Sequence, residues 1–155
     1  MTAFPVETAA EALFIAIEME RRAISLYERA QLLHPAPEVG KVIQLLLRDE
    51  RRHLAQFEAL AKQDGGVPDQ ALLLSAQAAG VLHPGGLMAA EREEAFADAR
   101  QLIAYAAREE STAVGRYQSF AAACQGEAKD MFLLIAHEEE KHLKALNALL
   151  EESGA

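Results

Sequence analysis

Apolar residues recur at steps of three and four along four stretches of the chain, which is the spacing of a buried helical face. The stretches that we predict to be helices are residues 6–33, 38–62, 88–124 and 127–151. A break at Pro35 and Pro37 separates the first two, and Gly126 separates the last two. Because both joints are short, each pair should form an antiparallel hairpin. Residues 64–87, with glycine and proline at both ends, are the predicted crossover between the hairpins. The pattern predicts an all-α four-helix bundle in a single domain.

Ionisable residues interrupt each apolar stripe near its middle. They are Glu20 in the first helix, Glu50 and His53 in the second, Glu110 in the third, and Glu139 and His142 in the fourth. Glu20 and Glu110 are 90 residues apart, whereas the two Glu-x-x-His units are 89 apart. This duplicated spacing should bring four carboxylates and two imidazoles to one height inside the bundle.

Burying these groups needs compensation, because an isolated carboxylate in a protein core costs several kcal/mol. Two divalent cations carry the four positive charges that balance four carboxylates. The Glu-x-x-His spacing places both groups on one helical face, so both can reach one ion. Glu20 and Glu110, from the other two helices, can then bridge the ions. Mixed oxygen and nitrogen ligands favour iron, with manganese as the alternative.

Other polar residues lie near these positions. Tyr27 and Tyr117 follow Glu20 and Glu110 by seven residues each and should face inward. They either pack in the core, or their hydroxyl groups donate hydrogen bonds to a ligand carboxylate or lie near bound oxidant. We expect the acidic residues beside the ligands to be solvated: Glu18, Asp49, Glu109, Glu138 and Glu140. We expect the remaining histidines to face solvent: His34, His83 and His137.

Composition narrows the functional classes. The net charge of −9 and the pI near 5.0 argue against nucleic acid and against an anionic membrane as partners. No apolar run approaches the roughly 20 residues that span a bilayer. Cys124 is the single cysteine, so neither an internal disulfide nor a four-cysteine metal site can form from these residues. A secretory signal begins with basic residues, and the first twelve residues here contain no Lys or Arg. We therefore expect a cytoplasmic protein.

The two Glu-x₆-Tyr and two Glu-x-x-His motifs resemble those of the rubrerythrin branch of the ferritin-like superfamily over nearly the whole chain. The resemblance implies a non-haem di-iron centre that reacts with hydrogen peroxide or dioxygen. Rubrerythrins commonly carry a four-cysteine rubredoxin-like domain, which these residues do not provide. They also carry an additional Glu one turn before the third-helix ligand, where this chain has Ala107, with Ile17 at the first-helix counterpart.

From these features we expect an oxidoreductase that reduces peroxide or dioxygen with electrons from an external donor protein. Ferrous iron oxidation with iron handling or storage is the main alternative. A hydroxylase acting on an organic substrate and a non-enzymatic metal-binding protein are two further alternatives. A homodimer paired through a helix face is also expected.

Overall fold

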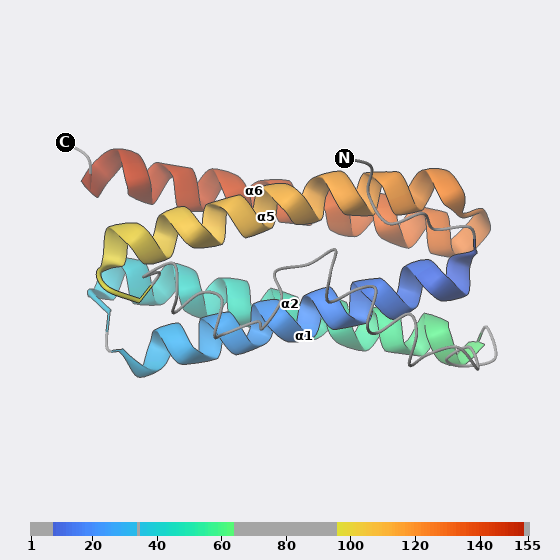
Figure 1. Cartoon of the computed structure of the whole chain (residues 1–155), viewed down its shortest axis with the longest axis horizontal. Coiled ribbons are helices and arrows are strands. Elements are labelled where there is room, and N and C mark those ends of the chain that lie inside the picture. Colours follow the sequence, from blue (N-terminus) through green and yellow to red (C-terminus); the bar gives the residue numbers. More distant parts are fainter. Residues whose placement is uncertain (1–7, 34, 64–95, 154–155) are drawn as a thin grey trace.

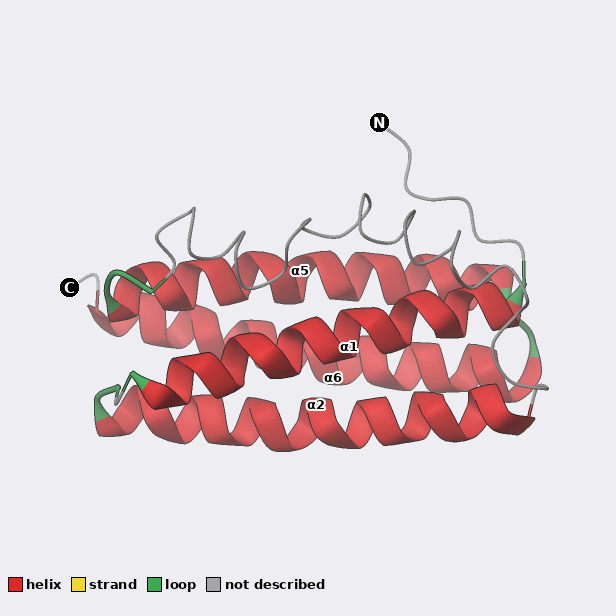
Figure 2. Cartoon of the chain, turned by 60° about the horizontal axis from the view of Figure 1, so that its bottom comes forward, coloured by secondary structure: helices red, strands yellow, loops and turns green. Residues whose placement is uncertain are grey.

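The computed structural model describes residues 8–33, 35–63 and 96–153, and the described part contains four helices and no strand. These helices are α1 (Ala9–Leu32), α2 (Pro37–Gln63), α5 (Ala99–Ala123) and α6 (Gly126–Ser153). The α1–α2 and α5–α6 pairs pack most closely, and contacts between α1 and α5 and between α2 and α6 join the two hairpins. Figures 1 and 2 show the four helices running side by side along the long axis. The predicted all-α four-helix bundle is confirmed.

The helix ends follow local capping chemistry. The Thr8 side chain accepts a hydrogen bond from the Glu11 backbone N–H, and the Glu11 side chain accepts one from the Thr8 N–H, which forms a capping box. Pro37 occupies the first position of α2, where its missing N–H costs nothing. Gly126 has a positive φ of 62°, a conformation that glycine adopts without a Cβ clash, and it reverses the chain between α5 and α6.

The third helix begins later than predicted. Residues 96–98 are not helical, and α5 starts at Ala99 because the Asp98 side chain accepts a hydrogen bond from the Gln101 backbone N–H. The prediction that this helix already includes residues 96–98 is therefore wrong. Its predicted start at residue 88 and the crossover at 64–87 lie outside the described residues. The other predicted helix ends agree with the structure to within three residues.

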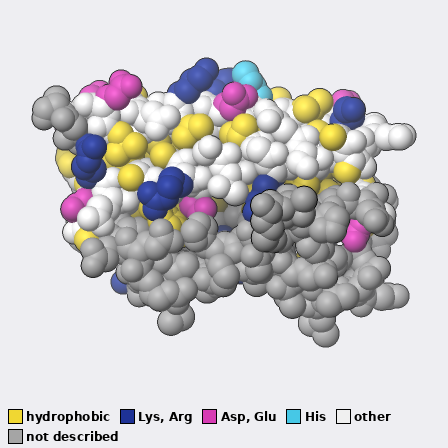
Figure 3. Space-filling view, turned by 45° about the horizontal axis from the view of Figure 1, so that its top comes forward, with side chains coloured by type: hydrophobic (Ala, Val, Ile, Leu, Met, Phe, Trp, Pro, Cys, Tyr) yellow, Lys and Arg dark blue, Asp and Glu magenta, His cyan; other side chains and the backbone are white. Residues whose placement is uncertain are grey.

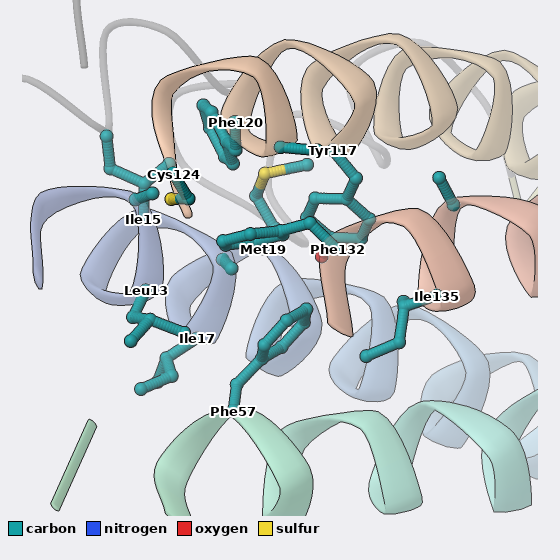
Figure 4. Packing of buried hydrophobic residues seen from close by; sticks show 14 of the residues in the cluster. Leu13, Ile15, Ile17, Met19, Phe57, Tyr117, Phe120, Cys124, Phe132 and Ile135 are labelled. Atoms are coloured by element: carbon teal, nitrogen blue, oxygen red, sulfur yellow. The ribbon is translucent and has the colours of Figure 1, made fainter. Parts of the chain in front are cut away.

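Two apolar layers fill the bundle interior. One contains the aromatic residues Phe57, Tyr117, Phe120 and Phe132, with ring centroids 5.2–6.2 Å apart (Figure 4). The other is built mainly from aliphatic residues, including Leu46, Ile103 and Leu146, and contains Tyr27 and Tyr105. Each layer therefore includes one of the two tyrosines that follow the predicted ligands.

The outside of the described part is mixed in character. Figure 3 shows hydrophobic side chains interspersed with basic and acidic ones on the side where α5 and α6 lie. Charged residues on the outer faces keep the helices amphipathic, and among the described helices none is long and apolar enough to cross a bilayer.

Candidate metal centre

The six predicted ligands meet inside the bundle. Glu20 comes from α1, Glu50 and His53 from α2, Glu110 from α5, and Glu139 and His142 from α6. Each is at most 4% exposed, and within the described part no other charged residue is buried. No buried Lys or Arg in these residues balances the carboxylates. The sequence periodicity therefore located all the buried glutamate and histidine residues of the described part.

The six residues form two overlapping groups of possible ligands. One group is Glu20, Glu50, His53 and Glu139, and the other is Glu50, Glu110, Glu139 and His142. In each group, one ligand-type atom per residue lies within 4.8 Å of the others. Glu50 and Glu139 belong to both groups, whereas Glu20 and Glu110 belong to one each. The carboxylates shared by the two groups are those of the Glu-x-x-His units, whereas the sequence suggested Glu20 and Glu110 as bridging residues.

The Nδ1 atoms of both histidines face this centre. His53 Nδ1 lies 3.0 Å from Glu50 Oε1, 3.5 Å from Glu139 Oε1 and 3.8 Å from Glu20 Oε1. His142 Nδ1 lies 2.9 Å from Glu139 Oε1, 3.5 Å from Glu110 Oε2 and 3.8 Å from Glu50 Oε1. The same oxygen of Glu50 and the same oxygen of Glu139 thus approach both imidazoles.

The outer nitrogen of each histidine contacts a carboxylate from the opposite hairpin. His53 Nε2 lies 2.7 Å from Glu138 Oε1, and His142 Nε2 lies 3.0 Å from Asp49 Oδ2. Such contacts fix the tautomer and the ring orientation of a metal-ligating histidine. The expectation that Asp49 and Glu138 are merely solvated is wrong, because the antiparallel packing of α2 on α6 brings each one to the opposite imidazole. Both precede the Glu of a Glu-x-x-His unit, and their 89-residue offset was the signal that could have revealed them.

The two tyrosines also reach across the bundle. Tyr27 donates a hydrogen bond to Glu110 Oε1 at 2.8 Å, and Tyr117 donates one to Glu20 Oε2 at 2.6 Å. Both tyrosines are buried. The prediction that their hydroxyl groups bond ligand carboxylates is confirmed. Each bond joins the first hairpin to the second. The carboxylates that accept these bonds, those of Glu110 and Glu20, each belong to only one of the two ligand groups.

Four atoms of the centre lack hydrogen-bond partners, whereas His53 Nδ1 and Glu50 Oε1 pair with each other at 3.0 Å. Glu20 Oε1, Glu110 Oε2, Glu139 Oε1 and His142 Nδ1 are fully buried and form no hydrogen bond within the described part. The 2.9 Å approach of His142 Nδ1 to Glu139 Oε1 does not have hydrogen-bond geometry. Native proteins rarely leave buried polar atoms unpaired without a reason such as an ion. All four atoms belong to proposed ligands, so the unsatisfied positions coincide with the proposed metal sites.

Burial and mutual repulsion perturb the ionisation of the centre. Burial raises the pKa of Glu50 and of Glu139 well above the usual range, and the charges of neighbouring carboxylates raise both further. Burial also raises the pKa of Glu20, although His53 partly offsets the rise. Burial and the neighbouring carboxylates thus both disfavour the charged form of these groups.

The histidines respond to the same carboxylates. Burial by itself lowers the pKa of each imidazole, but the acidic neighbours outweigh that effect. Glu20 and Glu50 raise the pKa of His53 to about 10. Glu110, Glu50 and Asp49 raise the pKa of His142 to about 9. Without metal, protonated imidazoles are thus the cations that partly balance the carboxylates.

Comparison with known proteins supports the resemblance in the second hairpin. The rubrerythrin family model matches residues 101–155, which include most of α5 and all of α6. This region contains Glu110, Tyr117, Glu139 and His142, and α1 and α2 lie outside it. This match confirms the predicted rubrerythrin-like character for residues 101–155. The search of curated proteins and the search of solved structures gave no significant match.

Proposed function

We propose that the protein binds two metal ions, with iron as the physiological metal, and acts as an oxidoreductase toward hydrogen peroxide or dioxygen. The single observation behind the proposal is that the buried polar residues of the described part form two overlapping ligand groups with unpaired inward-facing atoms. The rubrerythrin match to residues 101–155 supports iron as the metal.

The donor set fits such ions. Four carboxylates and two imidazoles are ligands that suit iron or manganese. Thiolate-rich sites, in contrast, favour zinc or copper(I). Glu20 and His53 would hold one ion, Glu110 and His142 the other, and Glu50 and Glu139 both. When bound, the metal pair supplies redox electrons and Lewis acidity toward the oxidant.

The protein residues keep the centre in position and dry. The tyrosine hydroxyls hold Glu20 and Glu110 through one oxygen each, which leaves the second oxygen facing the centre. Asp49 and Glu138 hold the outer nitrogens of the histidines and leave Nδ1 facing inward. The apolar layers on both sides exclude bulk water, which strengthens electrostatic interactions at the centre.

Reducing equivalents would come from an external donor. Cys124 is the single cysteine of the 155 residues and is buried, so these residues offer no four-cysteine iron centre to feed electrons inward. Such a donor would have to replace the electrons that each reaction with an oxidant consumes.

Anaerobic loading with ferrous iron followed by stopped-flow mixing tests the proposal. We expect two irons per chain, rapid oxidation by peroxide, and repeated turnover when a chemical reductant is supplied. Glu139→Gln should lose stoichiometric binding, while Glu140→Gln, which alters the neighbouring exposed carboxylate, should not. A chain that binds no iron contradicts the metal site. Fast oxidation by dioxygen alone, with iron then leaving the protein, indicates iron handling instead.

A further inference from the structure

Arg52 on α2 contacts both carboxylates that hold the histidines. Its Nη1 donates to Glu138 Oε1 at 3.3 Å, and its Nη2 donates to Asp49 Oδ1 at 3.3 Å. Glu138 belongs to α6, so this guanidinium joins the two hairpins just outside the centre. Its side chain is 45% exposed, whereas the Asp49 and Glu138 side chains are 17% and 23% exposed.

The geometry exploits a property specific to arginine. A guanidinium is planar and presents donors in several fixed directions, so one group can hold two carboxylates at once. Asp49 and Glu138 are both acidic, and a cation between them offsets their repulsion. Glu138 Oε1 accepts from Arg52 and also contacts His53 Nε2, so the position of Arg52 bears directly on the orientation of that imidazole.

The arrangement is asymmetric between the two halves. Lys141 stands 89 residues after Arg52, at the equivalent position of the second Glu-x-x-His unit, and an ammonium group lacks the planar fork. Asp49 is also approached by Arg48 Nε at 3.6 Å, so it keeps a cation when Arg52 is removed. Glu138 contacts Arg52 and His53 in the described part, and Arg52 is the arginine among these two partners.

We infer that Arg52 is a positioning residue that holds the outer hydrogen-bond acceptors of both histidines and thereby couples the two metal positions. The inference rests on the proposed function, in which His53 and His142 are ligands. Arg52 acts through Glu138 and Asp49 and touches no ligand atom at the centre. Removing the Arg52 side chain should disturb the orientation of His53 more than that of His142. The reason is that Asp49, the partner of His142, still contacts Arg48.

The test compares Arg52→Gln and Arg52→Lys with Arg51→Gln. Arg51 is the adjacent residue on α2, it pairs with Glu28 at 2.8 Å, and both partners are more than half exposed. Arg51→Gln therefore makes the same charge change away from the histidines. Two quantities are measured for each variant: the side-chain ¹⁵N NMR signals of the two histidines in metal-free protein, and the stepwise affinity for Co²⁺ by calorimetry and visible absorption.

Arg52→Gln should shift the Nε2 signal of His53 most and weaken Co²⁺ binding about 10-fold, as loss of an outer partner of a ligand commonly does. Arg52→Lys should fall between Arg52→Gln and wild type, and Arg51→Gln should match wild type. The Arg52→Gln effect should also shrink when Glu138 is already Gln, because the two residues act in series.

Three results separate the possible failures. Unchanged NMR signals and affinity in Arg52→Gln, with wild type binding two Co²⁺ ions, overturn the role of Arg52 and leave the metal proposal intact. Equal losses in Arg52→Gln and Arg51→Gln overturn it as well, because they indicate a general charge effect. If wild type binds no Co²⁺, the metal proposal fails, and the NMR signals alone decide whether Arg52 orients the histidines.

Discussion

The hydroxyl group of Tyr27 in α1 donates to Glu110 Oε1 in α5 at 2.8 Å, so a residue of the first hairpin fixes a carboxylate of the second. The bond from Tyr117 to Glu20, at 2.6 Å, is its counterpart in the opposite direction. The duplicated motifs therefore exchange partners: each half of the molecule orients a proposed ligand that the other half provides. The tyrosine that holds the glutamate of one hairpin therefore belongs to the other hairpin.

Tyr27→Phe and Tyr117→Phe should each weaken one metal position. Either substitution keeps the ring but leaves a buried carboxylate oxygen without its donor, which costs about 1–3 kcal/mol. We expect each variant to lose that amount of stability in denaturant titrations of the metal-free protein. In metal binding, Tyr27→Phe should disturb the binding step that involves Glu110, and Tyr117→Phe should disturb the binding step that involves Glu20. Each variant is therefore the control for the other. Equal effects on both binding steps would contradict this assignment.

The shared and unshared carboxylates should behave differently when they are neutralised. Glu50 and Glu139 belong to both ligand groups, so Glu50→Gln or Glu139→Gln should impair both steps of Co²⁺ binding in calorimetry. Glu20 and Glu110 belong to one group each, so Glu20→Gln or Glu110→Gln should leave one step close to wild type. The arrangement is disproved if Glu20→Gln abolishes both steps while Glu50→Gln spares one.

The ligand set could be predicted from the sequence because its signals are local. Helical periodicity places Glu50 and His53 on the same face as neighbouring apolar residues, and the 89-residue repeat supplies the second pair. The roles within the set depend on the rotation and register of one helix against another. For this reason the sequence suggests Glu20 and Glu110 as bridging residues, whereas the structure places Glu50 and Glu139 in both ligand groups.

The surroundings of the histidines were missed for a related reason. Asp49 lies off the apolar stripe of its own helix, and the stripe alone classifies it as solvated. Only the contact of α2 with α6 shows that it reaches His142, with Glu138 reaching His53 in the same way. The late start of α5 has a different cause. Asp98 is a residue type that commonly caps helices, but the apolar pattern continues through residues 96–98 and predicts an earlier start.

Phe57→Ala should be one of the most destabilising single changes in the described part. Phe57 is fully buried, and its ring lies 5.2 Å from that of Phe132 and 5.5 Å from that of Tyr117. Removing it leaves a cavity that costs about 3–5 kcal/mol, measured as free energy of unfolding. Because Tyr117 loses a packing partner, its bond to Glu20 should weaken as well. Leu134→Ala is the control: that side chain is 50% exposed, and its loss should change stability by less than about 0.5 kcal/mol.

The metal-free protein should lose stability as the pH rises above neutrality. The folded-state pKa values of His53 and His142, about 10 and about 9, lie above the value near 6.5 of an unfolded chain. The folded state therefore binds more protons than the unfolded state between pH 6.5 and about 10. The stabilising contribution is complete below pH 6.5 and is lost as the pH rises through the folded-state values. The raised pKa values of Glu20, Glu50 and Glu139 act in the same direction from lower pH.

Bound metal should reverse this trend, because its ligands must be deprotonated and its affinity grows with pH. Thermal unfolding between pH 6 and 9, with a chelator and with excess Mn²⁺, should therefore show a gap in Tm that widens as the pH rises. His53→Gln together with His142→Gln should flatten the decline of the metal-free protein, while His137→Gln, at an exposed site, should not. A metal-free protein whose stability rises across this range would mean that the histidines do not supply the compensating charge at the centre. The unpaired carboxylate oxygens would then need another source of neutralisation.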